Sequence, residues 1–136
     1  MAKRRILVVD DEPLMRNMVT NAFRRLGFNV LSAADGVEAL GLCARHLAGL
    51  QLLLTDLDLP HMSGLALLRT VRQMNSSTAL MVMAGCYSEA QRAELVALNV
   101  TAVLTKPFAQ EELLEALRQT LPAQSPPASC LSARTV

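Results

Sequence analysis

Five short apolar segments, each followed by a segment with helical spacing, constrain the fold of this chain more than any other feature. An apolar run of four to six residues is typical of a strand that is buried on both faces of a parallel sheet. Strands that alternate with helices across connections of a few residues predict one doubly wound α/β domain with a five-stranded parallel sheet. The expected strands are 5–9, 29–33, 50–55, 79–83 and 102–105.

The segments between these strands carry the start and stop signals of helices. Asp35 and Ser88 each begin a capping-box pattern, and Gly27 and Gly64 mark the end of the first helix and the beginning of the third. The last helix is expected at 111–121. Apolar side chains at helical spacing predict the buried faces of the first and second helices: Met15, Met18, Val19, Ala22 and Leu26, then Leu40, Cys43, Ala44 and Leu47.

The composition fits one globular domain over residues 3–121. Hydrophobic residues make up 51% of the chain and charged residues 18%, a balance that supports a buried core. Residues 122–136 differ, because three prolines among Ala and Ser disfavour a helix, and we expect a disordered tail there.

Charge and hydropathy patterns exclude several classes of protein. A net charge of +1, with no basic cluster after residues 3–5, argues against direct nucleic-acid binding. The apolar stretch behind those residues is too short for a signal peptide, and no run approaches the length of a membrane span. Cys43, Cys86 and Cys130 lack the spacing of metal ligands, which favours reduced thiols in a cytoplasmic protein.

Four charged residues stand directly after three of the predicted strands. Asp10 and Asp11 follow the first strand, Asp56 follows the third and Lys106 follows the fifth. Parallel strands end at one edge of their sheet, where open α/β sheets bind ligands, so we expect these side chains to meet. Clustered carboxylates are unfavourable unless a cation shares them, and the first expectation is a divalent metal ion. The alternative is that Asp11 only caps a helix that begins near Pro13.

Three motifs at these strand ends resemble the receiver domain of bacterial two-component response regulators. They are Val8-Val9-Asp10-Asp11-Glu12-Pro13, Asp56-x-x-x-Pro60-x-x-x-Gly64 and Lys106-Pro107-Phe108, in the family's order. The resemblance covers about residues 3–121. It implies a flavodoxin-like fold with strand order 2-1-3-4-5 and a cis peptide bond between Lys106 and Pro107.

The same resemblance implies a role for each residue of the acidic edge. Asp56 would accept a phosphoryl group from the phosphohistidine of a sensor histidine kinase or of a phosphotransfer protein. Mg²⁺ would be held by Asp10, Asp11 and Asp56 together with the backbone carbonyl of Asp58, and Lys106 would pair with the bound phosphoryl group. The chemistry agrees, because phosphoryl transfer needs positioning and charge neutralisation more than covalent help from the protein.

Two positions depart from the family's pattern. The family usually has Thr or Ser 22 positions before the lysine and often an aromatic residue three positions before it, whereas this chain has Ala84 and Val103. In the family, these two residues take part in the conformational change that follows phosphorylation. We therefore expect their replacement to affect that change more than it affects the acceptance of the phosphoryl group. One hypothesis is that the backbone N–H of Gly85 replaces the missing hydroxyl and that Tyr87 reports the movement.

These features favour a stand-alone phosphoacceptor that signals through contacts with other proteins. The resemblance implies an unidentified downstream protein, or a second copy of the chain, on the face of the fourth helix, fifth strand and fifth helix. One alternative is a phosphorylation-independent binding module, which the two departures motivate.

A more remote alternative is a phosphatase with Asp56 as nucleophile and Asp58 as general acid. Asp56-Leu57-Asp58 has the Asp-x-Asp form of haloacid-dehalogenase-type enzymes. In that family the motif ends the first strand rather than the third. We therefore expect a signalling protein and not an enzyme.

Overall fold

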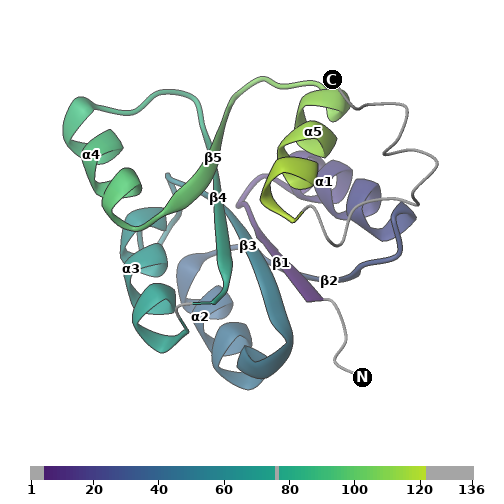
Figure 1. The fold of residues 1–136 in the computed structure, drawn as a ribbon, viewed down its shortest axis with the longest axis horizontal. Coiled ribbons are helices and arrows are strands. Elements are labelled where there is room, and N and C mark those ends of the chain that lie inside the picture. Colours follow the sequence, from purple (N-terminus) through teal and green to yellow (C-terminus); the bar gives the residue numbers. More distant parts are fainter. Residues whose placement is uncertain (1–4, 76, 122–136) are drawn as a thin grey trace.

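The computed structural model describes residues 5–75 and 77–121, which fold into three layers (Figure 1). A central sheet carries helices on both faces, and strands and helices alternate along the chain. The strands are β1 (Arg5–Val9), β2 (Asn29–Ala33), β3 (Leu50–Asp56), β4 (Ala79–Ala84) and β5 (Val100–Thr105). The helices are α1 (Pro13–Arg25), α2 (Gly36–Arg45), α3 (Gly64–Met74), α4 (Glu89–Ala97) and α5 (Gln110–Thr120), with a 3-10 turn at Leu47–Gly49.

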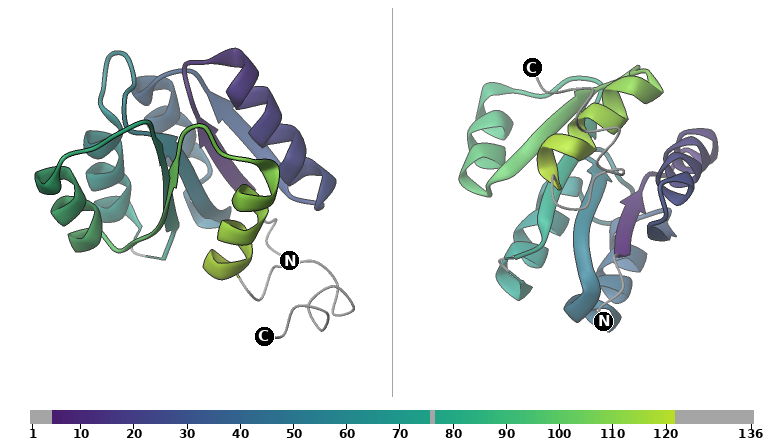
Figure 2. Two further views of the ribbon diagram at one scale, coloured as in Figure 1. Left: turned by 90° about the horizontal axis from the view of Figure 1, so that it is seen from above. Right: turned by 45° about the vertical axis from the view of Figure 1, so that its right-hand side comes forward.

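All five strands are parallel and lie in the order β2-β1-β3-β4-β5, which confirms the expected flavodoxin-like topology. Successive side chains of a strand point to opposite faces of the sheet. Ile6 and Val8 of β1 belong to the cluster that α1 and α5 cover, whereas Leu7 and Val9 belong to the cluster under α2, α3 and α4 (Figure 2). Both faces of β1 are fully buried, which explains why its sequence is almost wholly apolar.

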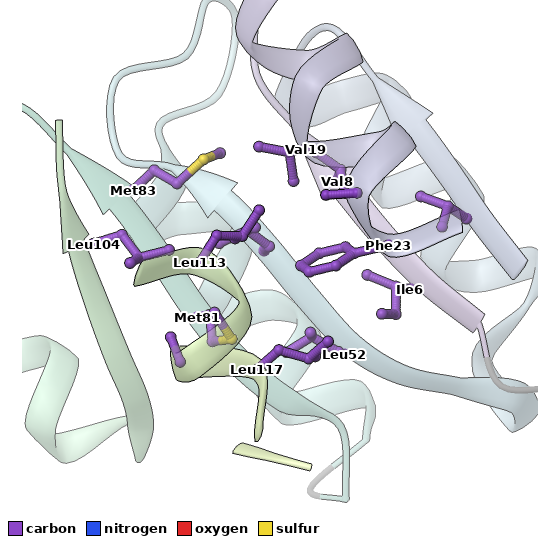
Figure 3. Packing of buried hydrophobic residues seen from close by; sticks show 14 of the residues in the cluster. Ile6, Val8, Val19, Phe23, Leu52, Met81, Met83, Leu104, Leu113 and Leu117 are labelled. Atoms are coloured by element: carbon purple, nitrogen blue, oxygen red, sulfur yellow. The ribbon is translucent and has the colours of Figure 1, made fainter. Parts of the chain in front are cut away.

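Phe23 of α1 lies in the cluster between α1, α5 and the sheet (Figure 3). Its side chain is fully buried, although it was absent from the predicted face of the helix. Burial of an aromatic side chain of this size stabilises the fold by roughly 2–3 kcal/mol. This packing anchors α1 to the sheet and thereby fixes the turn between Val9 and Pro13, which carries the first two acidic residues.

The predicted buried face of α2 is confirmed at Leu40 and Cys43 but not at Ala44 and Leu47. The helix ends at Arg45, so Leu47 lies in the 3-10 turn, and Gly36, Ala39 and Cys43 form the buried side. Ala44 is exposed, because each further helical residue rotates the side chain by about 100°.

Of the two predicted capping boxes, one forms completely. At the start of α4, Ser88 and Gln91 exchange both hydrogen bonds. At the start of α2, Asp35 accepts the N–H of Glu38 at 2.8 Å, but the Glu38 side chain accepts the N–H of Ala34 instead of that of Asp35. The box at α2 is therefore half formed, and the extra bond ties the helix to the end of β2.

Other boundaries move by one or two residues, and β5 begins at Val100 rather than Ala102. The predicted tail at 122–136, which includes Cys130, lies outside the described residues. Within residues 5–75 and 77–121, none of the helices has the length and apolar character needed to cross a bilayer.

Candidate functional site

Backbone hydrogen bonds continue the sheet beyond the strand ends and fix the residues of the acidic edge. The N–H of Asp10 donates to the carbonyl of Ala33 on β2 at 3.2 Å, and the N–H of Lys106 donates to that of Ala84 on β4 at 2.8 Å. Asp56 is the last residue of the central strand β3. The peptide bond after Lys106 is cis, as the resemblance implied. The residues predicted to meet are therefore held at one edge of the sheet.

Lys106 joins the two buried carboxylates of this edge. Its Nζ atom donates to Asp56 Oδ2 at 2.7 Å and to Asp10 Oδ2 at 3.0 Å. The second oxygen of each carboxylate accepts a backbone N–H, from Glu12 at 2.9 Å for Asp10 and from Asp58 at 3.0 Å for Asp56. Asp10 is fully buried and Asp56 is 7% exposed, so the ammonium neutralises charge where water screens it poorly.

Asp11 completes the cluster from the solvent side. Carboxylate oxygens of Asp10, Asp11 and Asp56 all lie within 4.8 Å of one another. Oxygens that share one octahedral Mg²⁺ ion at about 2.1 Å lie about 3.0–4.2 Å apart, so the cluster is close to the size that one ion requires. The donors are all hard oxygens, which suits Mg²⁺ better than a softer metal. The cluster therefore fits the predicted ion.

The alternative role of Asp11 as a helix cap is wrong. The residue at the cap of α1 is Glu12, and its side chain makes no capping hydrogen bond. Pro13 begins the helix as predicted, since the first helical position needs no N–H donor. Asp58, the fourth predicted ligand, has an exposed side chain and contacts Asp56 through its backbone.

Burial and charge pairing act in opposite directions on the titration of this edge. Burial raises the pKa of Asp10 above its ordinary value, and the hydrogen bonds from Glu12 and Lys106 only partly offset that rise. Burial lowers the pKa of Lys106, but the hydrogen bonds to Asp56 and Asp10 and the charges of these carboxylates together raise the pKa by more, so the net shift is upward. Lys106 is thus a cation at neutral pH. The three carboxylates of the cluster outnumber its single ammonium group, and this imbalance favours the binding of a further cation.

Gly64 allows the loop after β3 to close tightly against Asp56. A Cβ atom on Gly64 would lie 2.2 Å from the backbone oxygen of Asp56 and 2.7 Å from the Cα atom of Leu57. The N–H of Gly64 also donates to the carbonyl of Leu57 at 2.9 Å. The loop that follows Asp56 therefore requires glycine at position 64 for steric reasons. The spacing of the motif did not reveal this requirement.

The two positions that depart from the family's pattern lie on β4 and β5, the last two strands of the sheet. Ala84 is buried at the end of β4, and a Cβ atom on Gly85 would meet nothing within 4 Å. Val103 is half-buried on β5, and Tyr87 is 36% exposed in the loop before α4. The hypothesis for Gly85 and Tyr87 stays a prediction.

A groove of about 610 Å³ lies between the edge strand β5 and α5. Its lining combines small or branched apolar side chains with polar ones, and none of the lining residues is basic. Glu112 also accepts the N–H of Ala109 at the start of α5. Three glutamates give the groove its charge: Glu111, Glu112 and Glu115.

The two cysteines within the described ranges are free thiols in different environments. Cys43 is fully buried on the inner face of α2, and burial raises its pKa to about 11. Cys86 is exposed in the loop after β4.

Comparison with known proteins agrees with this geometry. The family model described as "Response regulator receiver domain" matches residues 6–118. The chain is 35% identical over 117 residues to the transcriptional regulatory protein TrcR of Mycobacterium tuberculosis, covering 86% of this chain and 45% of TrcR. It is 36% identical over 104 residues to the regulator of RpoS of Escherichia coli, covering 76% and 30% respectively. The chain thus spans less than half the length of these two relatives.

Solved structures show the same similarity. The chemotaxis protein CheY4 of Vibrio cholerae superimposes with a TM-score of 0.79 at 31% identity, covering 88% of this chain and 100% of CheY4. A receiver domain protein of Methanospirillum hungatei superimposes with a TM-score of 0.83 at 25% identity, covering 90% and 97% respectively.

Proposed function

Because this chain belongs to the response regulator receiver domain family, we propose that Asp56 accepts a phosphoryl group from a phosphohistidine donor. Receiver domains are signalling proteins of two-component systems and are not generally classed as enzymes. The proposed donor is a sensor histidine kinase or a phosphotransfer protein, and the proposed cofactor is Mg²⁺. The observation that carries this proposal is the buried edge where Lys106 contacts both Asp10 and Asp56 while Asp11 lies beside them.

The contacts of this edge match what in-line transfer requires. Hydrogen bonds from Asp58 N–H and Lys106 orient the Asp56 carboxylate, one oxygen of which attacks phosphorus as the P–N bond to the donor imidazole breaks. Asp10, Asp11, Asp56 and the Asp58 carbonyl would hold Mg²⁺, whose charge would offset repulsion between the carboxylate and the phosphoryl oxygens. Lys106 is close enough to pair with the phosphoryl group once the acyl phosphate has formed.

The proposal is tested by incubating the protein with a small phosphodonor and Mg²⁺ and measuring its intact mass. We expect the parent to gain one phosphoryl group, and to gain none in EDTA or as Asp56→Asn. Asp58→Asn is the matched control, because the Asp58 side chain is exposed and only its backbone is assigned a role. Phosphorylation of Asp56→Asn at the parent's level, or no phosphorylation of the parent, would contradict the proposal.

The groove between β5 and α5 supports a cationic downstream partner over a second copy of the chain. In a two-fold symmetric dimer the same patch meets itself, and since none of the residues that line the groove is basic, the lining itself offers Glu111 no opposite charge. We propose that this face binds a partner segment that carries Lys or Arg. The proposed location is the cytoplasm, where thiols stay reduced. Glu111→Lys should then weaken capture of the downstream protein, whereas dimerisation in sedimentation experiments would favour the second copy.

The second candidate function is a binding module that does not respond to phosphorylation, which Ala84 specifically favours. The two functions differ in what the loop after β4 does when a phosphoryl mimic binds Asp56. If the Gly85 N–H replaces the missing hydroxyl, beryllofluoride with Mg²⁺ will shift the amide resonances of Gly85 and Tyr87. Shifts confined to the neighbours of Asp56 would instead favour the binding module.

A further inference from the structure

Asp11 differs from the two buried carboxylates in the way it is held. The side chains of Asp10 and Asp56 are each fixed by Lys106 and by a backbone N–H. The Asp11 side chain is exposed, and no group in residues 5–75 or 77–121 donates a hydrogen bond to it. The position of Asp11 therefore depends on the backbone that carries it.

Arg16 of α1 holds this backbone. Its Nη1 atom donates to the carbonyl oxygen of Asp10 at 2.7 Å, the short distance of a charge-assisted hydrogen bond. That carbonyl belongs to the peptide unit between Asp10 and Asp11, and a peptide unit is planar. A bond to its oxygen limits rotation of the plane, and so limits the directions in which the Asp11 side chain can leave the turn.

Arg16 is itself well placed for this role. It is half-buried, and its N–H donates to the carbonyl of Glu12 at 2.9 Å within the first turn of α1. The hydroxyl of Thr20 donates to the carbonyl of Arg16 one turn later. The helix thus supplies a rigid base from which the guanidinium reaches back to the end of β1.

We propose that Arg16 is a positioning residue of the magnesium pocket, which holds the Asp10 carbonyl and thereby orients Asp11 toward the ion. This inference rests on the proposed Mg²⁺ site. The charge of Arg16 acts in the opposite direction, because a guanidinium near a divalent cation repels it. Loss of a positioning residue weakens Mg²⁺ binding, whereas loss of a nearby positive charge alone would strengthen it. The sign of the change separates the two roles.

The test is the Mg²⁺ dissociation constant of the free protein, measured by isothermal titration calorimetry. We expect Arg16→Ala to weaken binding roughly three- to tenfold, less than the 10- to 100-fold typical of groups bonded directly to a metal ligand. Arg24→Ala is the matched control, since Arg24 donates to the carbonyl of Val30 at 3.2 Å from the other end of the same helix. The Mg²⁺ affinity of Arg24→Ala should stay within about twofold of that of the parent.

Two further measurements keep the test decisive. Arg16→Lys retains the charge but not the reach and fork of the guanidinium. It should therefore weaken binding by less than Arg16→Ala, and it serves if the alanine variant fails to fold. In the metal-free protein, hydrogen exchange at the N–H of Glu12, which donates to Asp10, should be faster in Arg16→Ala than in Arg24→Ala.

The outcomes distinguish this inference from the proposed function. A parent protein that binds no Mg²⁺ would refute the proposed metal site and the role of Arg16 with it. A parent that binds Mg²⁺, with Arg16→Ala equal to it or tighter, would overturn only the role of Arg16.

Discussion

Replacement of Lys106 by methionine tests how the charges of the acidic edge are balanced. Methionine keeps much of the side chain's length and removes the ammonium, so Asp10 and Asp56 lose contacts of 3.0 and 2.7 Å. Removing one partner of a buried pair costs about 3–5 kcal/mol. The Lys106 side chain is 18% exposed, so solvent screens part of this interaction. We expect the free energy of unfolding at pH 7, without Mg²⁺, to fall by about 2–3 kcal/mol.

The size of this loss should depend on Mg²⁺ and on pH, with defined signs. The ammonium and Mg²⁺ neutralise the same carboxylates, so Mg²⁺ should stabilise Lys106→Met more than the parent. Burial already raises the pKa of Asp10, and loss of Lys106 raises it further. A raised carboxyl pKa favours the folded state at low pH and less so as the pH rises above the ordinary value of 3.8. The deficit of the variant should therefore be small in acid and grow toward neutral pH.

Urea unfolding in EDTA and in Mg²⁺ provides the measurement, with Arg92→Met as control because Arg92 is an exposed cation on α4. A deficit of this size lowers the midpoint of Lys106→Met by about 1–2 M urea, while the control should move little. Equal stability of Lys106→Met and the parent in EDTA would refute the reasoning, as would an equal gain from Mg²⁺ in both proteins.

Two further predictions concern a steric contact and a buried thiol. Gly64→Ala should lower the free energy of unfolding by about 2–3 kcal/mol, because the new Cβ atom meets the backbone of Asp56 at 2.2 Å. Gly41→Ala, in open space on α2, should instead be neutral or stabilise by about 0.5–1 kcal/mol, and a similar loss in both variants by chemical denaturation would contradict the contact. In the native protein at pH 8, iodoacetamide should label Cys86 and spare Cys43, as read by peptide mapping. Folding raises the pKa of Cys43 from 9.0 to about 11, so the folded state favours the neutral thiol. The stability that the neutral thiol contributes should therefore be lost as the pH rises from 9.0 to about 11. An identical pH dependence of stability in Cys43→Ala would argue against this.

The sheet and its order could be predicted because both faces of the strands are buried. An apolar run as short as Ile6–Val9 fits a strand that is buried on both faces and few other structures. The charged residues directly after it must then lie at the edge of the sheet. The same reasoning predicts that Asp10, Asp11, Asp56 and Lys106 meet, and in the structure Lys106 contacts Asp10 and Asp56 while Asp11 lies beside them.

The buried faces of the helices were harder to predict, because they depend on how each helix packs against the sheet. On α2 the packing buries Ala39 and Cys43, so Ala44 turns outward. Phe23 stands four residues after Val19, so helical spacing puts it on the same buried face, and the predicted face omitted it.

Contacts made with a backbone oxygen could not be predicted from the sequence. The role of Gly64 becomes visible only when its distance to the Asp56 carbonyl is known. Arg16 resembles any surface arginine of an amphipathic helix until its bond to the Asp10 carbonyl is seen. In both cases the contacting atom is a backbone oxygen. Every residue has one, so the sequence does not distinguish the residue that makes the contact.

The most direct test of the account is a crystal structure of the protein grown with Mg²⁺ and beryllofluoride. The account predicts beryllium bonded to one carboxylate oxygen of Asp56 and Lys106 directed at the fluorides. Mg²⁺ should be held by Asp10 and Asp11, directly or through water, together with Asp56 and the Asp58 carbonyl. Beryllium on another carboxylate, or Mg²⁺ bound away from these aspartates, would contradict it.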